Sequence, residues 1–185
     1  MTARHPERLR LRVPAPGELD YRRRLMADPA TMAYNRGYDL DFEGYHRETG
    51  CIDFPESDWA DWYDGFVGRE PERYCAYIAR ESDGAFIGEV NLHRSPEGGW
   101  HDMGIVLEAR YRGMGYAEEA LSLLLRHAFE AMGATAVRNE FEEVRQAALR
   151  THLACGFREI RRADGVVTLE ITREDYRRYQ GSGGM

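Results

Sequence analysis

An anion-binding loop is indicated by residues 110–115, which read RYRGMG. The loop follows an apolar run at residues 103–107 and precedes the most regularly amphipathic stretch of the chain, residues 116–132. The first N–H groups of a helix have no partner within the helix and carry the positive end of its dipole, and glycines let the backbone approach a phosphate closely. The spacing therefore predicts a phosphate site at a strand–loop–helix junction, with Arg110 and Arg112 adding positive charge at its rim.

Two common phosphate-binding motifs do not match this loop. A Walker loop requires Gly-Lys-Ser/Thr, and the chain contains no lysine. A dinucleotide-binding fingerprint requires a third glycine three residues after the second, where this chain has Glu118. That fingerprint also belongs near the start of a parallel sheet, whereas this loop follows predicted antiparallel hairpins. The pattern that remains is Arg/Gln-x-x-Gly-x-Gly/Ala, which Arg110, Gly113 and Gly115 match.

With this motif the chain resembles the GNAT superfamily of N-acetyltransferases, in particular its ribosomal-protein-alanine-acetyltransferase-like branch. The resemblance extends over most of the chain, through RLRLR at residues 8–12, DPATMAYN at 28–35, FIGE at 86–89, DMGI at 102–105 and CGF at 155–157. It implies an acyl-CoA-dependent N-acyltransferase. Such an enzyme moves acetyl from acetyl-CoA, its co-substrate, to a primary amine by direct transfer in a ternary complex, without a metal.

The resemblance also implies where the donor binds. The strand around residues 105–107 is expected to splay from its neighbour at residues 134–141, so that its freed backbone groups bind the pantetheine arm like an added strand. Backbone amides of residues 112–116 are expected to hold the pyrophosphate. Arg145 replaces an asparagine that is usual in the family and is expected to reach a phosphate. The expected donor-binding residues are Ile105, Val106, Leu107, Arg110, Arg112, Gly113, Met114, Gly115, Tyr116, Ala117 and Arg145.

Three carboxylates are candidates for the general base. Acetyl transfer requires that the amine lose a proton, that the thioester carbonyl be polarised and that the departing thiolate be protonated. Asp102 lies on the predicted central strand, Glu89 on the adjoining strand and Glu140 across the splay. By strand alternation, Asn91 and His93 share a face with Glu89, which gives that strand a polar row toward the cleft. Each carboxylate could equally be solvated or ion-paired, so the sequence does not choose among them.

His152 occupies the position at which relatives often carry a tyrosine that acts as the general acid. An imidazolium is a capable acid near neutral pH, because the ordinary pKa of histidine is about 6.5 and that of tyrosine about 10. The alternative is that His152, between Leu149 and Leu153, packs at the edge of the core. Both interpretations are open at this point.

Acidic and aromatic residues concentrate at residues 34–63, where the acceptor pocket is expected. They suit a cationic amine by charge and by cation–π contact. The alternative is that the aromatics form the core of a helix and the acids its solvated face, which is preferred for Trp59 and Tyr63. For the loop at residues 39–45 both interpretations are open. The acceptor is expected to be a small-molecule amine or a peptide N-terminus.

The elements that position these residues follow from periodicity and turn signals. Three hairpin strands come before a β-α-β crossover, which predicts a mixed α/β fold. Its sheet is mostly antiparallel, has about seven strands and carries helices on both faces. Strands are predicted at residues 8–13, 74–79, 85–93, 100–108, 134–141, 157–162 and 166–171, helices at 18–27, 55–67, 116–132, 144–155 and 173–179, and a loop at 39–53.

Composition narrows the class of protein. The 185 residues suit one domain, expected at residues 1–180 and followed by a disordered tail at 181–185. A net charge of −7 argues against a general nucleic-acid binder, and no apolar run approaches the roughly 20 residues of a membrane span. Three separated cysteines indicate neither disulfides nor a zinc site, which favours a cytoplasmic location.

Several alternatives remain open. They are a monomer or a homodimer through the last strands, a longer acyl donor, and a non-catalytic acyl-CoA sensor or scaffold.

Overall fold

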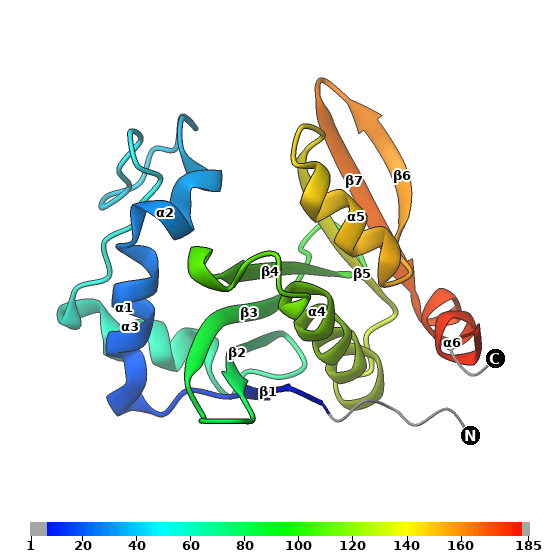
Figure 1. Cartoon of the computed structure of the whole chain (residues 1–185), viewed down its shortest axis with the longest axis horizontal. Helices are drawn as coiled ribbons and strands as arrows, with labels where there is room; N and C mark the ends of the chain where they lie inside the picture. The colour runs from blue at the N-terminus through cyan, green and yellow to red at the C-terminus, as the bar shows by residue number, and fades with distance from the viewer. Residues whose placement is uncertain (1–6, 183–185) are drawn as a thin grey trace.

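A seven-stranded sheet with the order β1-β2-β3-β4-β5-β7-β6 forms the centre of the computed structural model, which describes residues 7–182 (Figure 1). Every neighbouring pair is antiparallel except β4 and β5, which confirms the predicted mixed, mostly antiparallel sheet. The strands are β1 (Leu9–Arg12), β2 (Arg73–Arg80), β3 (Phe86–Arg94), β4 (His101–Leu107), β5 (Ala136–Glu142), β6 (Arg158–Ala163) and β7 (Val166–Thr172).

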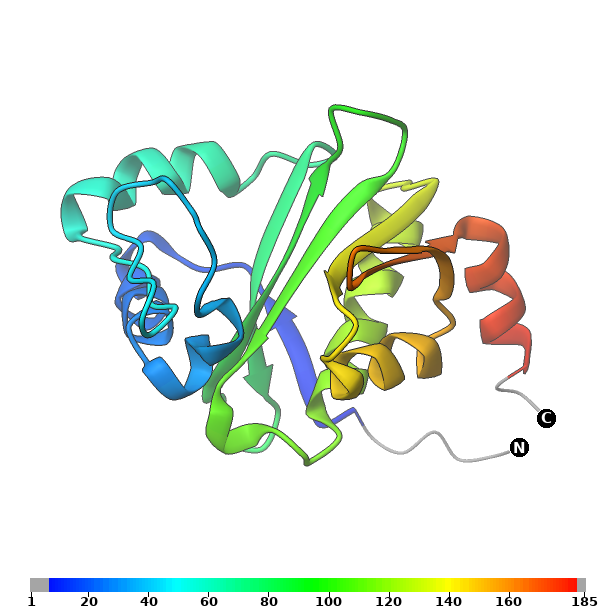
Figure 2. The same ribbon diagram turned by 90° about the horizontal axis from the view of Figure 1, so that it is seen from above.

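Helices cover both faces of the sheet, as predicted (Figure 2). One face carries α1 (Leu19–Met26), α2 (Pro29–Met32) and α3 (Glu56–Phe66). The other carries α4 (Tyr116–Arg126), α5 (Gln146–Ala154) and α6 (Arg173–Ser182). The helices α1 to α3 come before β2 in the chain and α4 to α6 come after β4, and the central strands lie between these two groups.

The apolar stripe of α4 explains its place against the sheet. Leu121 and Leu124 recur at helical spacing and are fully buried in a core cluster that also holds Val90 of β3 and Val137 of β5. On the opposite face a smaller cluster joins residues of α1 to Tyr77 of β2. Burial of apolar area stabilises both layers, at about 25 cal/mol per Å². The sheet is thus fixed from both sides, and its central strands are held where the site lies.

Two helical features differ from the sequence prediction. The regular helix α4 ends at Arg126 and continues as a π-helical segment, η4 (His127–Ala131), instead of running to residue 132. The short α2 was not predicted, because four residues are too few to show a helical period. Its start is nevertheless encoded: the Asp28 carboxylate accepts hydrogen bonds from the amides of Ala30 and Thr31, with Pro29 at the first helical position.

The loop predicted at residues 39–53 is tied to the fold by backbone hydrogen bonds. The amide of His46 donates to Cys51 at 2.9 Å, and that of Ile52 donates to Met26 at 3.1 Å. A Cβ on Gly50, whose φ is +77°, would lie 2.3 Å from a backbone oxygen of α2. These contacts hold the segment at residues 39–53 in a defined position against α1 and α2.

At the C-terminus α6 extends to Ser182, so the tail expected from residue 181 begins inside a helix. Residues 183–185 of that expected tail lie outside the described part.

Candidate active site

The two central strands part after a short stretch of pairing. β4 and β5 are joined only through the pairs His101–Val137 and Asp102–Arg138, whereas β4 stays paired with β3 as far as Leu107. Beyond the Asp102–Arg138 pair, which we call the apex, the β5 side of β4 has no strand partner. An extended ligand can pair with such a free strand edge. The splay expected of this pair is therefore present.

The loop after β4 presents backbone N–H groups at the start of α4. Gly113 and Gly115 have φ angles of 73° and 78°, a left-handed conformation that residues with a side chain rarely adopt. Gly115 is the N-cap of α4, and no side chain caps this end of the helix. The first amides of α4 therefore have no side-chain cap among the described residues, and the anion site expected there stays a prediction.

The two arginines of the loop have different roles from the predicted one. The guanidinium of Arg112 donates to the carbonyl of Thr31 at 2.6 Å and to that of Leu107 at 3.2 Å. It therefore ties the loop to α2, and burial lowers its pKa. Arg110 is ion-paired with Glu108 at 2.7 Å and lies on the surface. This corrects the expectation that Arg110 and Arg112 add positive charge at the rim of the loop. The side chain of Arg112 binds the carbonyls of Thr31 and Leu107, and only its backbone lies in the loop.

Arg8 is a residue near the loop that sequence reasoning missed. Its guanidinium donates to the carbonyl of Met114 at 3.2 Å, pairs with Glu119 at 2.9 Å and lies 4.7 Å from the centre of the Tyr116 ring. In the sequence, Arg8 is only one of the polar residues of a strand in which polar and apolar residues alternate. β1 and α4 lie side by side in the fold, and this brings the charge to the loop.

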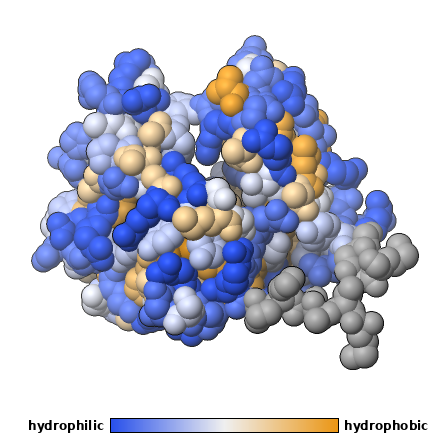
Figure 3. All heavy atoms as spheres, in the orientation of Figure 1, coloured by the Kyte–Doolittle hydropathy of each residue, from blue (hydrophilic) through white to orange (hydrophobic). Residues whose placement is uncertain are grey.

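Arg145 lies across the opening from η2 (Ala33–Asn35). Its guanidinium is 5.0 Å from the ring of Tyr34 and 5.4 Å from the ring of Phe141, and it makes no ion pair among the described residues. Tyr34, Arg145 and their neighbours line a pocket of about 350 Å³. Figure 3 shows the molecule hollowed between its two upper masses, above the place where Figure 1 draws β4. Arg145 is available to an anionic ligand in this opening.

His152 is buried, with 2% of its surface exposed, and both ring nitrogens are engaged. Nδ1 lies 2.8 Å from the backbone carbonyl oxygen of Ala148, and Nε2 lies 2.9 Å from the side-chain amide nitrogen Nδ2 of Asn139. Nδ1 therefore carries the hydrogen and Nε2 accepts one. Burial lowers the pKa of the ring, which keeps it neutral. Of the two interpretations, this environment supports packing at the core edge over a general acid.

Glu89 faces α1 and α3 and is 3% exposed. One carboxylate oxygen pairs with Arg22 of α1, and the guanidinium of Arg22 lies 4.5 Å from the centre of the Trp62 ring. The other carboxylate oxygen and the Nε of Arg22 are buried without a hydrogen-bond partner. A carboxylate held against a guanidinium is a weak base, so this environment supports a structural role.

Asp102 lies at the apex and is partly exposed, at 37% of its side chain. Its Oδ1 accepts a hydrogen bond from the indole of Trp100 at 3.0 Å, and its Oδ2 lies 3.8 Å from Nε2 of His93. It lines a pocket of about 530 Å³ with residues of β5, β6 and β7, among them Glu140 and Arg138. Of the three predicted carboxylates, Asp102 is the one that stands at the parting of the strands.

The aromatic residues of the predicted acceptor region divide into two groups. The indole of Trp59 donates to the carbonyl of Phe54 at 3.0 Å, and the hydroxyl of Tyr63 donates to that of Pro14 at 3.1 Å. These two residues are structural, as preferred above. Tyr38 and Phe42 of the loop are exposed, together with its acids.

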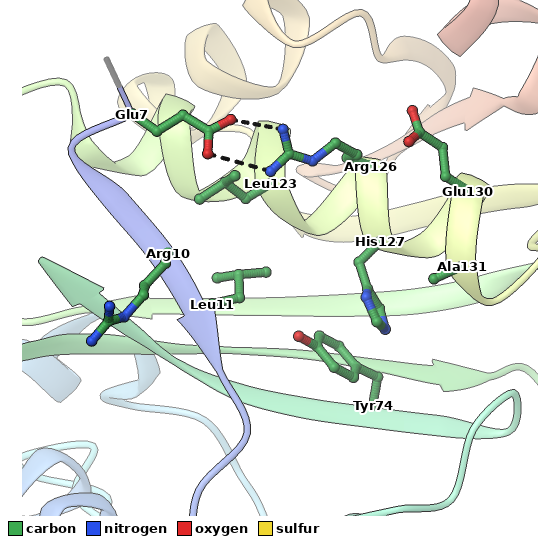
Figure 4. Close-up of a pocket in the computed structure, with 9 residues that line it drawn as sticks. All are labelled: Glu7, Arg10, Leu11, Tyr74, Leu123, Arg126, His127, Glu130 and Ala131. Atoms are coloured by element: carbon green, nitrogen blue, oxygen red, sulfur yellow. Dashed lines mark hydrogen bonds and ion pairs between the residues drawn. The ribbon is translucent and has the colours of Figure 1, made fainter. Parts of the chain in front are cut away.

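A separate pocket of about 450 Å³ lies between β1 and the last turns of α4 (Figure 4). Its charged side chains are satisfied locally, since Arg126 pairs with Glu7 at 2.7 Å and His127 pairs with Glu70. The His127 ring also stacks on Tyr74. The pocket lies away from the β4–β5 opening and is not a part of this site.

Within residues 7–182, no three His, Cys, Asp or Glu side chains are grouped so that they could hold a metal ion. In the same part of the chain, no helix has the length and apolar character needed to cross a membrane.

Comparison with solved structures identifies the fold. The spermidine N-acetyltransferase from Vibrio cholerae in complex with CoA and spermine superposes with a TM-score of 0.72 at 16% identity, over 92% of this chain and 99% of that one. FdhC, a nucleotide-linked sugar GNAT, gives 0.70 at 19% identity over 96% and 93%. A GNAT-family acetyltransferase from Bacillus anthracis gives 0.68 at 16% identity over 92% and 98%. At such identities the likeness concerns the fold.

No curated protein matches the sequence. Comparison with known protein families, in contrast, matches residues 8–158 to the acetyltransferase (GNAT) domain, which is most of the chain and includes the opening, the loop and α5. The chain therefore belongs to the GNAT acetyltransferases, enzymes that transfer acetyl from acetyl-CoA to an amine.

Proposed function

We propose that this enzyme acetylates the primary amine of a small molecule by direct transfer in a ternary complex. One arrangement carries the proposal: beyond the apex the β5 side of β4 is unpaired, uncapped helix amides follow β4, and a pocket of about 530 Å³ lies beside Asp102. An extended thioester donor fits the first part. A compact acceptor fits the pocket at the apex.

In this proposal the donor is held mainly by backbone. β4 pairs with the pantetheine arm through Ile105, Val106 and Leu107, and the segment from Arg112 through Gly113, Met114 and Gly115 to Tyr116 and Ala117 receives the pyrophosphate. Arg145, which makes no ion pair among the described residues, supplies a positive charge to a phosphate, whereas the charge of Arg110 is paired with Glu108.

The acceptor side is proposed to lie around Asp102. Its partial exposure and its place at the apex support this residue as part of the apparatus that removes a proton from the amine. The buried pair of Glu89 with Arg22 supports a structural role for Glu89. The neutral ring of His152 supports the same conclusion for that residue. The thiolate is then protonated by the proton that the nitrogen releases as the amide forms.

The named acceptors of two relatives favour a small molecule over a peptide: one structure contains spermine, and another protein acts on a nucleotide-linked sugar. A peptide N-terminus, the acceptor expected for the ribosomal-protein-alanine-like branch, is the second candidate. The homodimer and the cytoplasmic location stay predictions.

The test measures CoA-thiol release from acetyl-CoA with four acceptors: spermidine, tyramine, glucosamine and the dipeptide Ala-Ala. We expect release that depends on one of the three small amines. Release with Ala-Ala alone would support the peptide acceptor. Calorimetric binding of acetyl-CoA without release would support the sensor class. Absence of acetyl-CoA binding would overturn the proposal.

A further inference from the structure

A histidine and an aspartate face each other at the apex of the opening. His93 of β3 and Asp102 of β4 are directly paired in the sheet register, and Asp102 is in turn paired with Arg138 of β5, the last pair before the strands part. Nε2 of His93 lies 3.8 Å from Oδ2 of Asp102. Catalytic hydrogen bonds are often this long before the substrate binds.

The carboxylate of Asp102 is oriented by a third group. The indole of Trp100 donates to Oδ1 at 3.0 Å, which leaves Oδ2 on the side of His93. When this contact closes to a hydrogen bond, Nε2–H donates to Oδ2 and Nδ1 is left to accept a proton. The arrangement of a base oriented by a fixed acid is the one that activates reacting groups in many enzymes.

The surroundings of His93 leave its ring accessible. Its side chain is 51% exposed. On β2 its register partner is Arg73, whose guanidinium is engaged by α3, 3.3 Å from the carbonyl of Gly65 and 4.5 Å from the centre of the Phe66 ring. The charged group that faces His93 from β4 is Asp102. The ring is therefore open to an acceptor on its exposed side and has Asp102 as its charged neighbour on β4.

We propose that His93 is the general base of the reaction and that Asp102 acts through it as a positioning residue. The inference rests on the proposed function. An imidazole suits this task better than a carboxylate, because histidine ordinarily titrates near pH 6.5 and aspartate near about 3.9, and a base works best when it titrates close to the operating pH.

The proton balance is complete without a further reactant. The acceptor ammonium gives one proton to Nδ1 of His93, and its nitrogen forms a bond to the thioester carbonyl carbon as the carbon–sulfur bond breaks. The second proton leaves the nitrogen as the amide forms and goes to the thiolate. The imidazolium returns its proton to water, so each turnover yields an amide, CoA thiol and one proton.

The test compares kcat/KM over pH 5.5 to 9.5 for the acceptor that the wild type uses fastest among the four named above. We expect His93→Gln to lower kcat/KM about 100-fold and to flatten its decline on the acid side. Asp102→Asn lowers it less, about 10-fold. Added imidazole restores part of the activity of His93→Gly, which a purely structural role would not allow. Acetyl-CoA affinity stays within about twofold in each variant.

The chain supplies a control in a second histidine–carboxylate pair, which lies outside the site. His127 pairs with Glu70 and lines the pocket between β1 and the end of α4. We expect His127→Gln to keep kcat/KM within about twofold. Undiminished activity of His93→Gln would overturn the proposal. Loss of activity in Asp102→Asn alone would also overturn it and make Asp102 the base.

A second measurement does not depend on the acceptor. The ¹⁵N NMR signals of the neutral His93 ring report which ring nitrogen carries the hydrogen, and we expect Nε2–H in the wild type and a mixture of the two tautomers in Asp102→Asn. The same tautomer mixture in both proteins would overturn the His93–Asp102 pairing even if none of the four acceptors reacts. The expected change of tautomer without any acetyl transfer would place the failure in the proposed function.

Discussion

The donor half and the acceptor half of the proposed site are built in different ways. The proposed donor half is a continuous segment, from β4 through the glycine loop into α4, and its assigned contacts are mainly backbone groups. The acceptor half collects side chains from β3, β4 and β5, which the sheet register brings to one face. A site made of backbone groups needs glycines at a fixed spacing, and a sequence shows that spacing directly. A site made of side chains needs partners from distant strands, and a sequence does not show which residues those are.

Because of this difference, we expect the donor half to respond to substitutions within its own segment and the acceptor half to respond to substitutions at distant positions. Arg22 on α1 and Glu89 on β3 are far apart in the sequence, yet their ion pair fixes the face on which the acceptor residues stand. Gly115, by contrast, needs only its own backbone angle to place the amides that follow it. The predictions below test each half in turn.

The largest effect is expected from Arg22→Met, which leaves the buried Glu89 without its partner. Removing one partner of a buried pair costs about 3–5 kcal/mol of the free energy of unfolding, measured by urea denaturation. Arg23→Met, which breaks an exposed pair with Asp20 on the same helix, is the control, and its cost stays below about 1 kcal/mol. Equal losses of unfolding free energy in the two variants would contradict the idea that the Arg22–Glu89 ion pair supports the acceptor half.

Gly115→Val tests the local construction of the donor half. A branched side chain at a φ of 78° costs about 1–3 kcal/mol, so the loop leaves its binding conformation and the Kd for acetyl-CoA rises about 10- to 100-fold. Isothermal calorimetry measures the change. Gly17→Val is the control, because Gly17 has no neighbour within 4 Å of a Cβ and needs no left-handed backbone. Unchanged affinity in Gly115→Val would separate the loop from the donor.

Arg145→Gln removes the one side-chain charge that the proposal assigns to the donor phosphates. Loss of a charged hydrogen bond corresponds to about a 10-fold higher Kd for acetyl-CoA, with kcat little changed. Arg150→Gln, at an exposed position of α5, the helix that Arg145 precedes, is the control and leaves the Kd unchanged. If both variants bind as the wild type does, the donor is held by backbone alone, which would sharpen the contrast between the halves.

The smallest effect on activity is expected from His152→Phe, with kcat within about threefold of the wild type. A large loss would restore His152 as the general acid. The variant also has a pH signature, because burial lowers the pKa of the folded-state ring below its ordinary value of about 6.5. The unfolded chain therefore binds more protons below pH 6.5, and wild-type stability falls there as pH falls. Denaturation curves at pH 5 and pH 7 should show this decrease in the wild type and not in His152→Phe.

Among the features that sequence reasoning missed, contacts between distant segments predominate. Arg8 reads as one residue of an edge strand, and its contact with Met114 depends on the packing of β1 beside α4. Tyr34 and Arg145 are more than a hundred residues apart and meet only across the opening. Arg112 was expected to meet phosphate, but α2, too short to show a period, offers it carbonyl groups instead. None of these contacts leaves a local pattern.

What the sequence determined by itself is the fold class and the glycine loop between β4 and α4. The reason is that alternation, helical period and the two glycines are properties of neighbouring residues. The tertiary structure decided which polar side chains share a space. It buried His152 between two hydrogen-bond partners and paired Glu89 with Arg22. It also set His93 opposite Asp102 where the strands part, because register and burial depend on the whole chain.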